Sequence, residues 1–470
     1  MKKTKIICTM GPSCSDREIL KKMMLAGMNV ARFNFSHGTH EEHLERIELF
    51  KSVRDELGLP AAMMLDTKGP EYRIKTFKNG SIILQDGAYF SLTANDVEGN
   101  EERVSVSYKD MIHELNIGDR ILLNNGLIIL EALQKTETDV ICKVIVGGEL
   151  SNRKSMSFPN KVLKQVYLSE QDKEDLLFGI KNDMDYVACS FVSCRQDVLD
   201  VRNFLNENGG DDIDIIAKIE NRSGVDNIDE ILSVSDGIMV ARGDMGVEIP
   251  YEELPAIQKK LITTCRYRGK RVITATEMLE SMIHNPRPTR AEISDVANAV
   301  YDGTSAVMLS GETAAGKYPV EAVQAMSKIA NETEHNIHYK KRFATSSFEI
   351  RNMTDALSHS TCSLAMDVGA KVIVACTRSG MTARLISRFR SPIPIIGMTT
   401  DEKAYRKLAL SWGVLPVLAE EFNSTDVLFY HAVVKAKQSG LADKGDTIVI
   451  TGGMTNGKSG NTNMIKIETI

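Results

Sequence analysis

The residues of this chain that could do chemistry follow short apolar runs. Lys218 and Glu220 close the run at residues 214–219, and their spacing of two places both side chains on one face of an extended segment. Asp244 follows the next apolar run, directly after Gly243. Carboxylates hold a hard divalent cation such as Mg²⁺, and an ammonium stabilises negative charge that develops on a phosphoryl group or an enolate. These side chains therefore predict phosphoryl or enolate chemistry, with a salt bridge and a plain glycine turn as the structural alternatives.

Hydroxyl, amide and charged side chains follow other apolar runs in the same way. Four of these side chains, those of Asn34, Ser36, Asp66 and Thr67, offer only oxygen ligands. They could form a second site, for a monovalent cation, or they could make ordinary turn hydrogen bonds. His37 is expected to be a hydrogen-bonding loop residue and not a base. Zinc is disfavoured, because no histidine stands in ligand spacing with a cysteine. The side chains in question are Arg32, His37 and Thr276, together with the oxygen donors Asn34, Ser36, Asp66 and Thr67.

The composition is that of a globular protein with several domains. In 470 residues, hydrophobic residues make up 43% and charged residues 26%, and 57 basic against 63 acidic side chains give a net charge of −6. The acidic excess argues against nucleic acid as the main partner, and no apolar run reaches the roughly 18–20 residues that cross a bilayer. The 8 cysteines are scattered without CxxC pairs and no secretory leader is recognisable, so we expect reduced thiols and a cytoplasmic protein.

The apolar runs alternate with amphipathic stretches, which predicts an α/β fold. Three strands precede residue 69, and the alternation resumes near residue 170 with five more. Eight strand–helix units predict a (β/α)8 TIM barrel made of residues 1–69 and 167–340, with its active site at the carboxyl ends of the strands. The predicted strands cover residues 5–8, 29–33, 61–65, 186–190, 214–219, 237–240, 272–275 and 306–309.

Two further domains interrupt and follow the barrel. Between residues 70 and 166, Asn-Gly and Asp-Gly pairs separate β-type runs, which predicts an inserted all-β domain, a β-barrel that acts as a lid over the strand ends. A polar linker at 340–353 precedes an open α/β domain at 354–470. In that domain residues 377–382 join a strand to a helix, where hydroxyls and free amides can bind phosphate.

Five motifs resemble those of pyruvate kinase. They are Phe-Asn-Phe-Ser-His-Gly at 33–38, Leu-Asp-Thr-Lys-Gly-Pro-Glu at 65–71, Lys-Ile-Glu-Asn at 218–221, Ala-Arg-Gly-Asp-Met-Gly-Val-Glu at 241–248 and Asn-Pro-Arg-Pro-Thr-Arg-Ala-Glu at 285–292. The resemblance covers the whole chain, including the inserted and C-terminal domains. It implies an enzyme that transfers the phosphoryl group of phosphoenolpyruvate to ADP, giving pyruvate and ATP in the last step of glycolysis.

The same resemblance implies roles for individual residues. The catalytic residues would be Lys218, Thr276, Arg32 and Arg73. The residues that bind phosphoenolpyruvate would be Arg32, Gly243, Asp244 and Thr276. The residues that bind nucleotide would be Asn34, His37, Arg73 and Lys154. Mg²⁺ or Mn²⁺ would be held by Glu220 and Asp244, and K⁺ by Asn34, Ser36, Asp66 and Thr67. A phosphorylated sugar activator would be bound by Thr377, Ser379 and Thr382.

The resemblance further implies a homotetramer and activation by potassium, since Glu71 matches the residue that accompanies potassium dependence in the family. Two alternatives stay open at the level of sequence. One is a metal-dependent lyase or aldolase that acts on the pyruvate enolate. The other is a catalytically silent regulator that binds sugar phosphates.

The chain departs from the family pattern at four places, and the changes bear on lid closure and nucleotide affinity. Because a lid carboxylate is missing, we expect slower or weaker lid closure. The departures are Asn124 and Asn125 in place of two aspartates, Ser-Phe-Pro-Asn at 157–160, Ser193 and Cys194 in place of an Arg-Lys pair, and Glu277 in place of glutamine.

Overall fold

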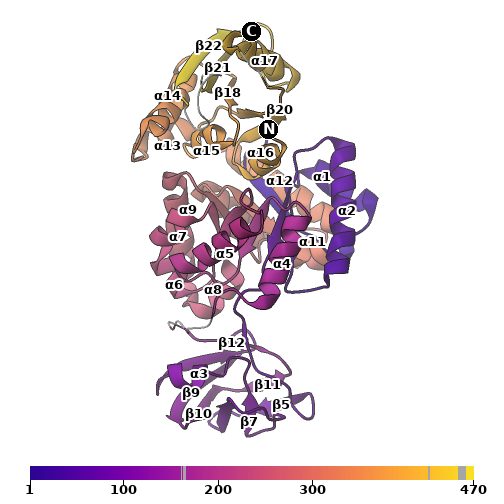
Figure 1. Ribbon diagram of the computed structural model, residues 1–470, viewed down its shortest axis with the longest axis vertical. Helices are drawn as coiled ribbons and strands as arrows, with labels where there is room; N and C mark the ends of the chain where they lie inside the picture. The colour runs from indigo at the N-terminus through magenta and orange to yellow at the C-terminus, as the bar shows by residue number, and fades with distance from the viewer. Residues whose placement is uncertain (160, 162, 164–165, 422–423, 454–461) are drawn as a thin grey trace.

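Eight parallel strands close into a barrel at the middle of the molecule (Figure 1). The computed structural model describes residues 1–470 except 160, 162, 164–165, 422–423 and 454–461. The ring closes where β1 pairs with β17, with Lys5 opposite Ala306. The predicted barrel is thereby confirmed, with strand limits shifted by one residue in places. Its strands are β1 (Lys5–Thr9), β2 (Val30–Asn34), β3 (Ala62–Asp66), β13 (Tyr186–Cys189), β14 (Asp214–Ile219), β15 (Gly237–Ala241), β16 (Arg271–Ala275) and β17 (Ala306–Leu309).

The barrel strands are apolar on both faces, as expected for parallel strands that are covered on both sides. Side chains such as Ile7, Met64 and Ile216 belong to one buried cluster. Side chains of the other parity, such as Ile6 and Leu65, belong to a second cluster that includes the surrounding helices. Packing on both faces fixes the strand ends, so the polar residues that follow them share one rim.

The barrel helices begin at caps that their sequences provide. In α2 and α10 the hydroxyl of a threonine, Thr39 or Thr289, accepts a hydrogen bond from the amide three residues on. The carboxylate of the glutamate at that position accepts one from the threonine amide. The cap of α1 is Asp16, whose side chain accepts from the amides of Glu18 and Ile19. The helices are α1 (Arg17–Ala26), α2 (His40–Leu57), α4 (Glu170–Lys181), α5 (Arg195–Glu207), α6 (Arg222–Asp226), α7 (Ile228–Val234), α8 (Arg242–Glu248), α9 (Leu254–Arg268), α10 (Arg290–Asp302), α11 (Gly311–Ala314) and α12 (Pro319–His335).

The inserted segment forms a β domain with its own buried core, which includes Phe90 and Leu130. Its main sheet has the order β4-β12-β8-β9-β10-β6-β7, and β11 pairs with β5. Asn124 and Asn125 have φ values of 52° and 56°, so they form the tight turn between β8 and β9. The short helix α3 was not predicted. The elements are β4 (Tyr72–Arg73), β5 (Ser81–Leu84), β6 (Tyr89–Thr93), β7 (Arg103–Ser105), α3 (Met111–Glu114), β8 (Arg120–Leu123), β9 (Ile128–Lys135), β10 (Asp139–Val146), β11 (Gly148–Ser151) and β12 (Ser155–Ser157).

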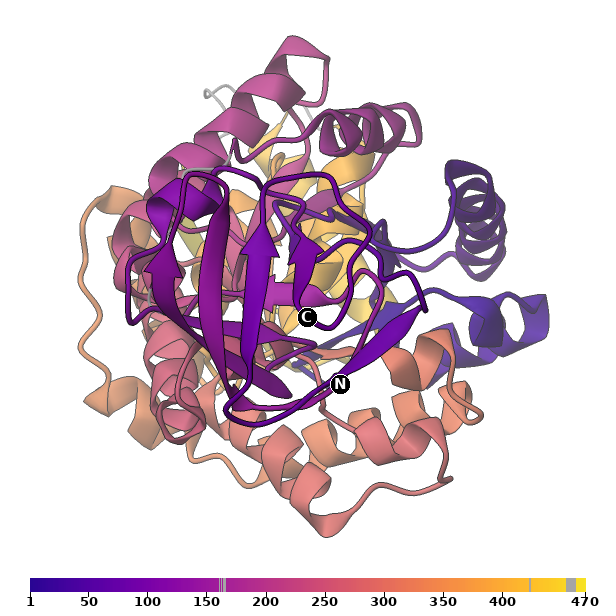
Figure 2. The same ribbon diagram turned by 90° about the horizontal axis from the view of Figure 1, so that it is seen from below.

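The β domain lies over one end of the barrel, as the views from the side and from below show (Figures 1 and 2). Its hairpin turn touches α8, because a Cβ added to Gly126 would lie 3.4 Å from Val247. In addition, the carboxylate of Glu248 accepts hydrogen bonds from the Ser157 hydroxyl and the Phe158 amide. The lid therefore rests on α8 at two points.

The C-terminal domain is an open sheet of order β20-β19-β18-β21-β22, covered by helices (Figure 1). This confirms the predicted open α/β fold. Strand β22, antiparallel to β21, was not predicted, and helix α13 occupies part of the expected linker. The domain limits proposed from the sequence stay predictions. The elements are α13 (Tyr339–Thr345), α14 (Met353–Asp367), β18 (Val372–Cys376), α15 (Met381–Ser387), β19 (Ile395–Thr399), α16 (Glu402–Lys407), β20 (Val414–Leu418), α17 (Thr425–Gln438), β21 (Thr447–Gly452) and β22 (Met464–Thr469).

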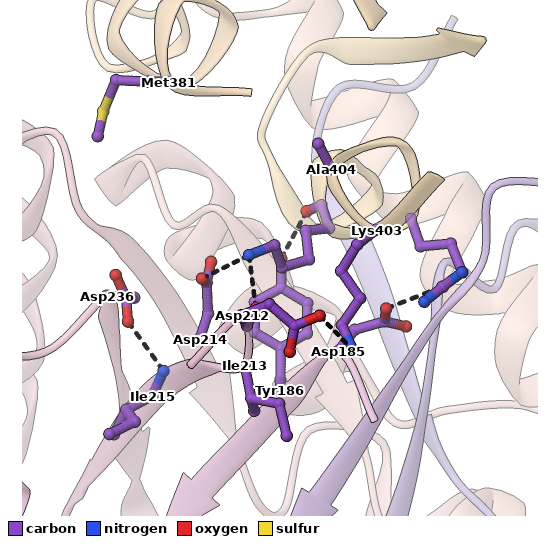
Figure 3. Close-up of polar contacts among 12 residues, drawn as sticks. Asp185, Tyr186, Asp212, Ile213, Asp214, Ile215, Asp236, Met381, Lys403 and Ala404 are labelled. Carbon is purple, nitrogen blue, oxygen red and sulfur yellow. Dashed lines mark hydrogen bonds and ion pairs between the residues drawn. The ribbon is translucent and has the colours of Figure 1, made fainter. Parts of the chain in front are cut away.

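Helix α16 rests on the amino ends of the barrel strands (Figure 3), at the end of the barrel opposite the lid (Figure 1). Arg406 Nε lies 2.8 Å from Asp185 Oδ1, and Lys407 Nζ lies 2.8 Å from Asp214 Oδ1. The Tyr186 hydroxyl donates to the carbonyl of Lys407 at 2.5 Å. Charged and polar groups thus join the C-terminal domain to the barrel. None of the described helices combines the length and apolar character of a membrane span.

Candidate active site

Lys218 is the centre of the polar cluster at the carboxyl ends of the barrel strands. Its ammonium lies 2.7 Å from Ser190 Oγ, 3.0 Å from Glu220 Oε1 and 3.1 Å from Asp66 Oδ1. Burial opposes the charge on Lys218, but the carboxylates of Asp66 and Glu220 raise its pKa above the ordinary lysine value. The side chain is therefore a fixed ammonium at neutral pH.

Asp66 connects Lys218 to a second cation. Its Oδ2 accepts from Arg32 Nε at 2.6 Å, and Arg32 Nη1 donates to Thr9 Oγ1 at 2.9 Å. Burial alone would raise the pKa of Asp66, but Arg32 and Lys218 lower it below the usual range. The ionised carboxylate holds together two cations that would otherwise repel each other.

Glu220 places one carboxylate oxygen beside this ammonium, at ion-pair distance. Its Oε2 accepts from the Phe191 amide at 2.5 Å. Its Oε1 is buried and has no hydrogen-bond partner among the described residues, since the contact with Lys218 lacks hydrogen-bond geometry. Burial raises the pKa of Glu220 to about 7; Lys218 opposes this rise and the charge of Asp244 adds to it.

These groups fit a hard divalent cation. Mg²⁺ uses one or two protein carboxylates and completes its shell with water and substrate oxygens. Glu220 supplies a buried oxygen that is ion-paired with Lys218 but makes no hydrogen bond to the described residues, and Asp244 supplies an exposed carboxylate close enough to affect Glu220. Within the described ranges no group of three or more His, Cys, Asp or Glu side chains could hold a metal unaided. The donor set is thus one that needs substrate oxygens to complete it.

The loop after β16 is strained and held by an ion pair. Thr276 has a φ of 74°, which is unfavourable for a β-branched residue. It also packs on α8, because a Cβ added to Gly243 would lie 2.8 Å from Thr276 Cγ2. Arg242 donates to the Thr276 carbonyl at 2.6 Å and pairs with Asp295 at 2.7 Å. Strain that neighbouring groups maintain is typical of a functional position.

Two hydroxyl groups of the cluster, those of Ser190 and Thr9, were missed by reasoning from the sequence. Ser190 Oγ accepts from Lys218 and donates to the Thr67 carbonyl at 2.6 Å. Thr9 ends β1 and orients Arg32. Both follow or end barrel strands like the predicted residues, so strand position was a signal that could have found them.

The predicted potassium ligands lie together only in part. Asn34 is the register partner of Asp66, on neighbouring strands, and Thr67 follows directly. Asn34 Oδ1 accepts from the amide of Ser36 at 3.2 Å, and the side chain of Ser36 is exposed. The structure brings three of the four residues side by side and leaves their role a prediction.

Three of the four predicted nucleotide-binding residues lie outside the Lys218 cluster, whereas Asn34 lies beside Asp66. Arg73 begins the β domain, where Nη1 donates to the Arg153 carbonyl at 2.6 Å and Nη2 lies 2.5 Å from Glu71 Oε1. Lys154 directly precedes β12, which pairs with the strand of Arg73. His37 is exposed after β2. These residues belong to the lid, its connection and the barrel rim.

A cavity of about 570 Å³ lies between the lid and the barrel. Tyr72 and Phe158 line it from the lid, and Asn221, Asp244 and Glu248 line it from the barrel. Its volume lies within the roughly 300–1,000 Å³ of sites that enclose small organic ligands. Asp244 therefore faces a space that can hold a small phosphorylated compound.

The predicted effector residues lie at the carboxyl end of β18, in the C-terminal domain. Thr377 and Ser379 belong to the loop before α15, and Ser379 is exposed. The hydroxyl of Thr382 is buried and lies 2.7 Å from that of Thr462. Most of the glycine-rich segment at residues 451–463 lies outside the described residues.

The fold and this cluster define a barrel enzyme that acts on an anionic small molecule beneath a β lid. Family models described as "Pyruvate kinase, barrel domain" and "Pyruvate kinase, alpha/beta domain" match residues 1–323 and 355–468. The chain belongs to the pyruvate kinase family, which makes it a phosphotransferase.

Relatives of full length agree with this assignment. The pyruvate kinase of Clostridium acetobutylicum is 48% identical over 472 residues, which are 100% of both chains. That of Staphylococcus haemolyticus is 48% identical over 100% of this chain and 81% of its own. The crystal structure of a pyruvate kinase from Cryptosporidium parvum superposes with a TM-score of 0.95 at 38% identity, covering 100% of this chain and 96% of that one.

Proposed function

We propose that this protein transfers the phosphoryl group of phosphoenolpyruvate to ADP and so forms pyruvate and ATP. The observation that carries the proposal is the buried ammonium of Lys218, held between Asp66 and Glu220 at the carboxyl ends of the barrel strands. Similarity over the full length to bacterial pyruvate kinases supports the same reaction. It argues against the two alternatives considered from the sequence, a lyase and a silent regulator.

The residues of the cluster suit phosphoryl transfer. Its loose transition state requires positioning and neutralisation of charge more than covalent chemistry by the protein. Lys218 stabilises the charge on the migrating phosphoryl group and then on the enolate oxygen. Arg32, anchored by Asp66, contacts the phosphate of the substrate. Arg73, on the lid connection, contacts the nucleotide side of the transfer.

Three further residues orient the substrate in this proposal. The backbone amides of Gly243 and Asp244 belong to the first turn of α8, where amides have no partner within the helix, and they bind the substrate carboxylate. Thr276 positions the donor of the proton that the enolate carbon receives. Asn34, His37 and Lys154 bind the nucleotide.

The proposal includes two cations. Glu220 and Asp244 hold Mg²⁺ or Mn²⁺, which supplies Lewis-acid neutralisation of phosphoryl oxygens when bound. Asn34, Ser36, Asp66 and Thr67 hold K⁺. Glu71 supports a requirement for K⁺, since it is a carboxylate at the position where family members that do not need the ion carry an ammonium.

Regulation and assembly are proposed from the family resemblance. Thr377, Ser379 and Thr382 bind the phosphate of a sugar activator, and the buried hydroxyl of Thr382 lies within reach of Thr462. We further propose a homotetramer located in the cytoplasm. The Asn124-Asn125 turn makes lid closure slower or weaker than in relatives with aspartates there.

A coupled assay tests the function. Pyruvate formed from phosphoenolpyruvate and ADP is reduced by an added dehydrogenase, and the rate is compared between the native enzyme and Lys218→Gln. Removing one preorganised donor to a developing charge lowers kcat by about 10²–10³-fold. Lys173→Gln is the matched control, because Lys173 is on the barrel surface and, among the described residues, pairs only with Glu170, at 2.6 Å. Equal rates for Lys218→Gln and the control would refute the proposed role.

The same assay tests the cations. Activity should require a divalent metal and should fall when K⁺ is replaced by tetramethylammonium at equal ionic strength. The variant Glu71→Lys should reduce this dependence on K⁺, because its ammonium substitutes for the ion. A rate that is unaffected by the exchange of K⁺ would contradict the potassium site while leaving the phosphoryl transfer untouched.

A further inference from the structure

The peptide unit that joins Ser190 to Phe191, here called the 190–191 peptide unit, is held from both sides. Its N–H, which belongs to Phe191, donates to Glu220 Oε2 at 2.5 Å. Its carbonyl, which belongs to Ser190, accepts from the Tyr167 hydroxyl at 2.7 Å. A peptide unit is planar and rigid. A group that fixes the carbonyl therefore also fixes the direction in which the N–H points at Glu220.

The backbone at this point needs such support. Phe191 has a φ of 57°, in the left-handed region that residues with a Cβ rarely adopt. A conformation of this kind persists only where surrounding groups maintain it. Thr67 fixes the preceding residue, because the Ser190 amide donates to Thr67 Oγ1 at 3.2 Å and the Ser190 hydroxyl donates to the Thr67 carbonyl at 2.6 Å. Tyr167 and Glu220 fix the 190–191 peptide unit itself.

Tyr167 is suited to the task of donor. Its side chain is buried, and burial raises the pKa of its phenol well above the ordinary value. The hydroxyl therefore keeps its proton. A hydrogen bond that a carbonyl accepts polarises the peptide unit and strengthens its N–H as a donor. The Tyr167 hydroxyl thus acts on the carboxylate of Glu220 through one peptide unit.

Tyr167 also lies where the lid joins the barrel. It stands between β12 and α4, on the second of the two connections between the domains. On the first connection Gly69 packs on the same loop, since a Cβ added to Gly69 would lie 2.8 Å from Ser190 Cβ and 2.9 Å from the Ser190 carbonyl oxygen. Both connections of the lid therefore meet at Ser190, whose hydroxyl accepts from Lys218 at 2.7 Å.

We propose that Tyr167 is a positioning residue, which holds the 190–191 peptide unit in the orientation that aligns Glu220 for the divalent cation. The same loop presents the Ser190 hydroxyl to Lys218, so the ammonium is aligned with it. This inference rests on the proposed function, from which the roles of Glu220 and Lys218 are taken. Tyr167 acts through the peptide unit and not on the substrate.

The variant Tyr167→Phe removes the hydroxyl and keeps the ring. The net contribution of one neutral hydrogen bond corresponds to about a fivefold change in a rate or an equilibrium. In the coupled assay we expect kcat to fall about fivefold, and the Mg²⁺ concentration for half of the full rate to rise about fivefold. The KM for phosphoenolpyruvate at saturating Mg²⁺ should stay within about twofold, because the amides proposed to bind the substrate carboxylate belong to α8.

Tyr186→Phe is the matched control. Tyr186 is also buried, and its hydroxyl also donates to a backbone carbonyl, that of Lys407, at the other end of the barrel. Both variants should lower the melting temperature, whereas Tyr186→Phe should keep the kcat and the Mg²⁺ dependence of the native enzyme. If Tyr167→Phe melts at a lower temperature but keeps both kinetic constants, the residue supports the fold alone and the inference is overturned.

Electron paramagnetic resonance of Mn²⁺ measures the cation without turnover. With phosphoenolpyruvate present and ADP omitted, Tyr167→Phe should bind Mn²⁺ about fivefold more weakly than the native enzyme, and Tyr186→Phe should bind it equally. Equal Mn²⁺ affinity in all three proteins would refute the alignment of Glu220 by Tyr167. The native enzyme separates this inference from the proposed function: an inactive native enzyme refutes the function, whereas an active one with an equally active Tyr167→Phe refutes only the positioning role.

Discussion

The hydroxyl of Ser190 gives the sharpest test of how the active site is organised. Of the three groups that contact the Lys218 ammonium, Ser190 Oγ lies closest, at 2.7 Å. The Ser190 hydroxyl donates its own hydrogen to the Thr67 carbonyl at 2.6 Å. Its lone pairs therefore face Lys218 in a fixed direction. In Ser190→Ala the ammonium loses this acceptor and turns toward Asp66 and Glu220, which continue to hold it.

The size of the effect follows from the bond that is lost. A hydrogen bond to a charged group contributes roughly 1.5–3 kcal/mol. Because two carboxylates still bind the ammonium, we expect the lower end, about 1.5 kcal/mol, which lowers kcat about tenfold. The Thr67 carbonyl also loses its donor, so the free energy of unfolding should fall by about 1–3 kcal/mol. The coupled assay gives kcat and KM, and thermal unfolding gives the stability.

Ser193→Ala is the matched control for Ser190→Ala. Its hydroxyl donates to the Phe191 carbonyl at 3.3 Å and accepts from Asn221, without touching Lys218. This variant should keep kcat within about twofold of the native value. An unchanged kcat in Ser190→Ala, with the protein folded, would show that Ser190 does not orient Lys218 for catalysis.

Three further outcomes are expected. Burial raises the pKa of Glu248 to about 7, although the Ser157 hydroxyl and the Phe158 amide donate hydrogen bonds to its carboxylate. Ionisation of Glu248 therefore destabilises the native fold as pH rises from about 4.5 through 7. The melting temperature of Glu248→Gln relative to native enzyme should therefore increase across that window, and a constant difference would contradict the pKa. Asn125→Asp should raise kcat or lower the KM for ADP, and no change in either disproves impaired lid closure. Arg242→Lys cannot keep both the ion pair with Asp295 and the adjacent carbonyl contact, so kcat should fall about tenfold; native kinetics would show that the strained loop needs no such support.

The barrel and the chemistry of its rim could be predicted from the sequence for a physical reason. Parallel strands buried on both faces appear as continuous apolar runs, and such strands expose their carboxyl ends on one rim. The positions of Lys218, Glu220 and Asp66 follow from that rule. In the structure the Lys218 ammonium lies 3.0 Å from the carboxylate of Glu220 and 3.1 Å from that of Asp66.

The features that could not be predicted from the sequence depend on contacts between distant segments. Ser190 is a common loop residue until the fold places it beside Lys218, and Thr9 becomes relevant only through Arg32. Strand β22 is half exposed and pairs antiparallel at the sheet edge, so its apolar pattern is weak.

The closure of the barrel has a consequence for synthesis of the chain. Thr9 donates to the carbonyl of Leu309, 300 residues later, where the first strand meets the last. During translation β1 therefore leaves the ribosome long before its second neighbour exists, and the lid is made in between. Pairing between such distant segments is slow, and an open strand edge is prone to aggregation. The nascent barrel must keep its first edge protected until β17 emerges, which marks β1 as a site where chaperones should bind unfinished chains.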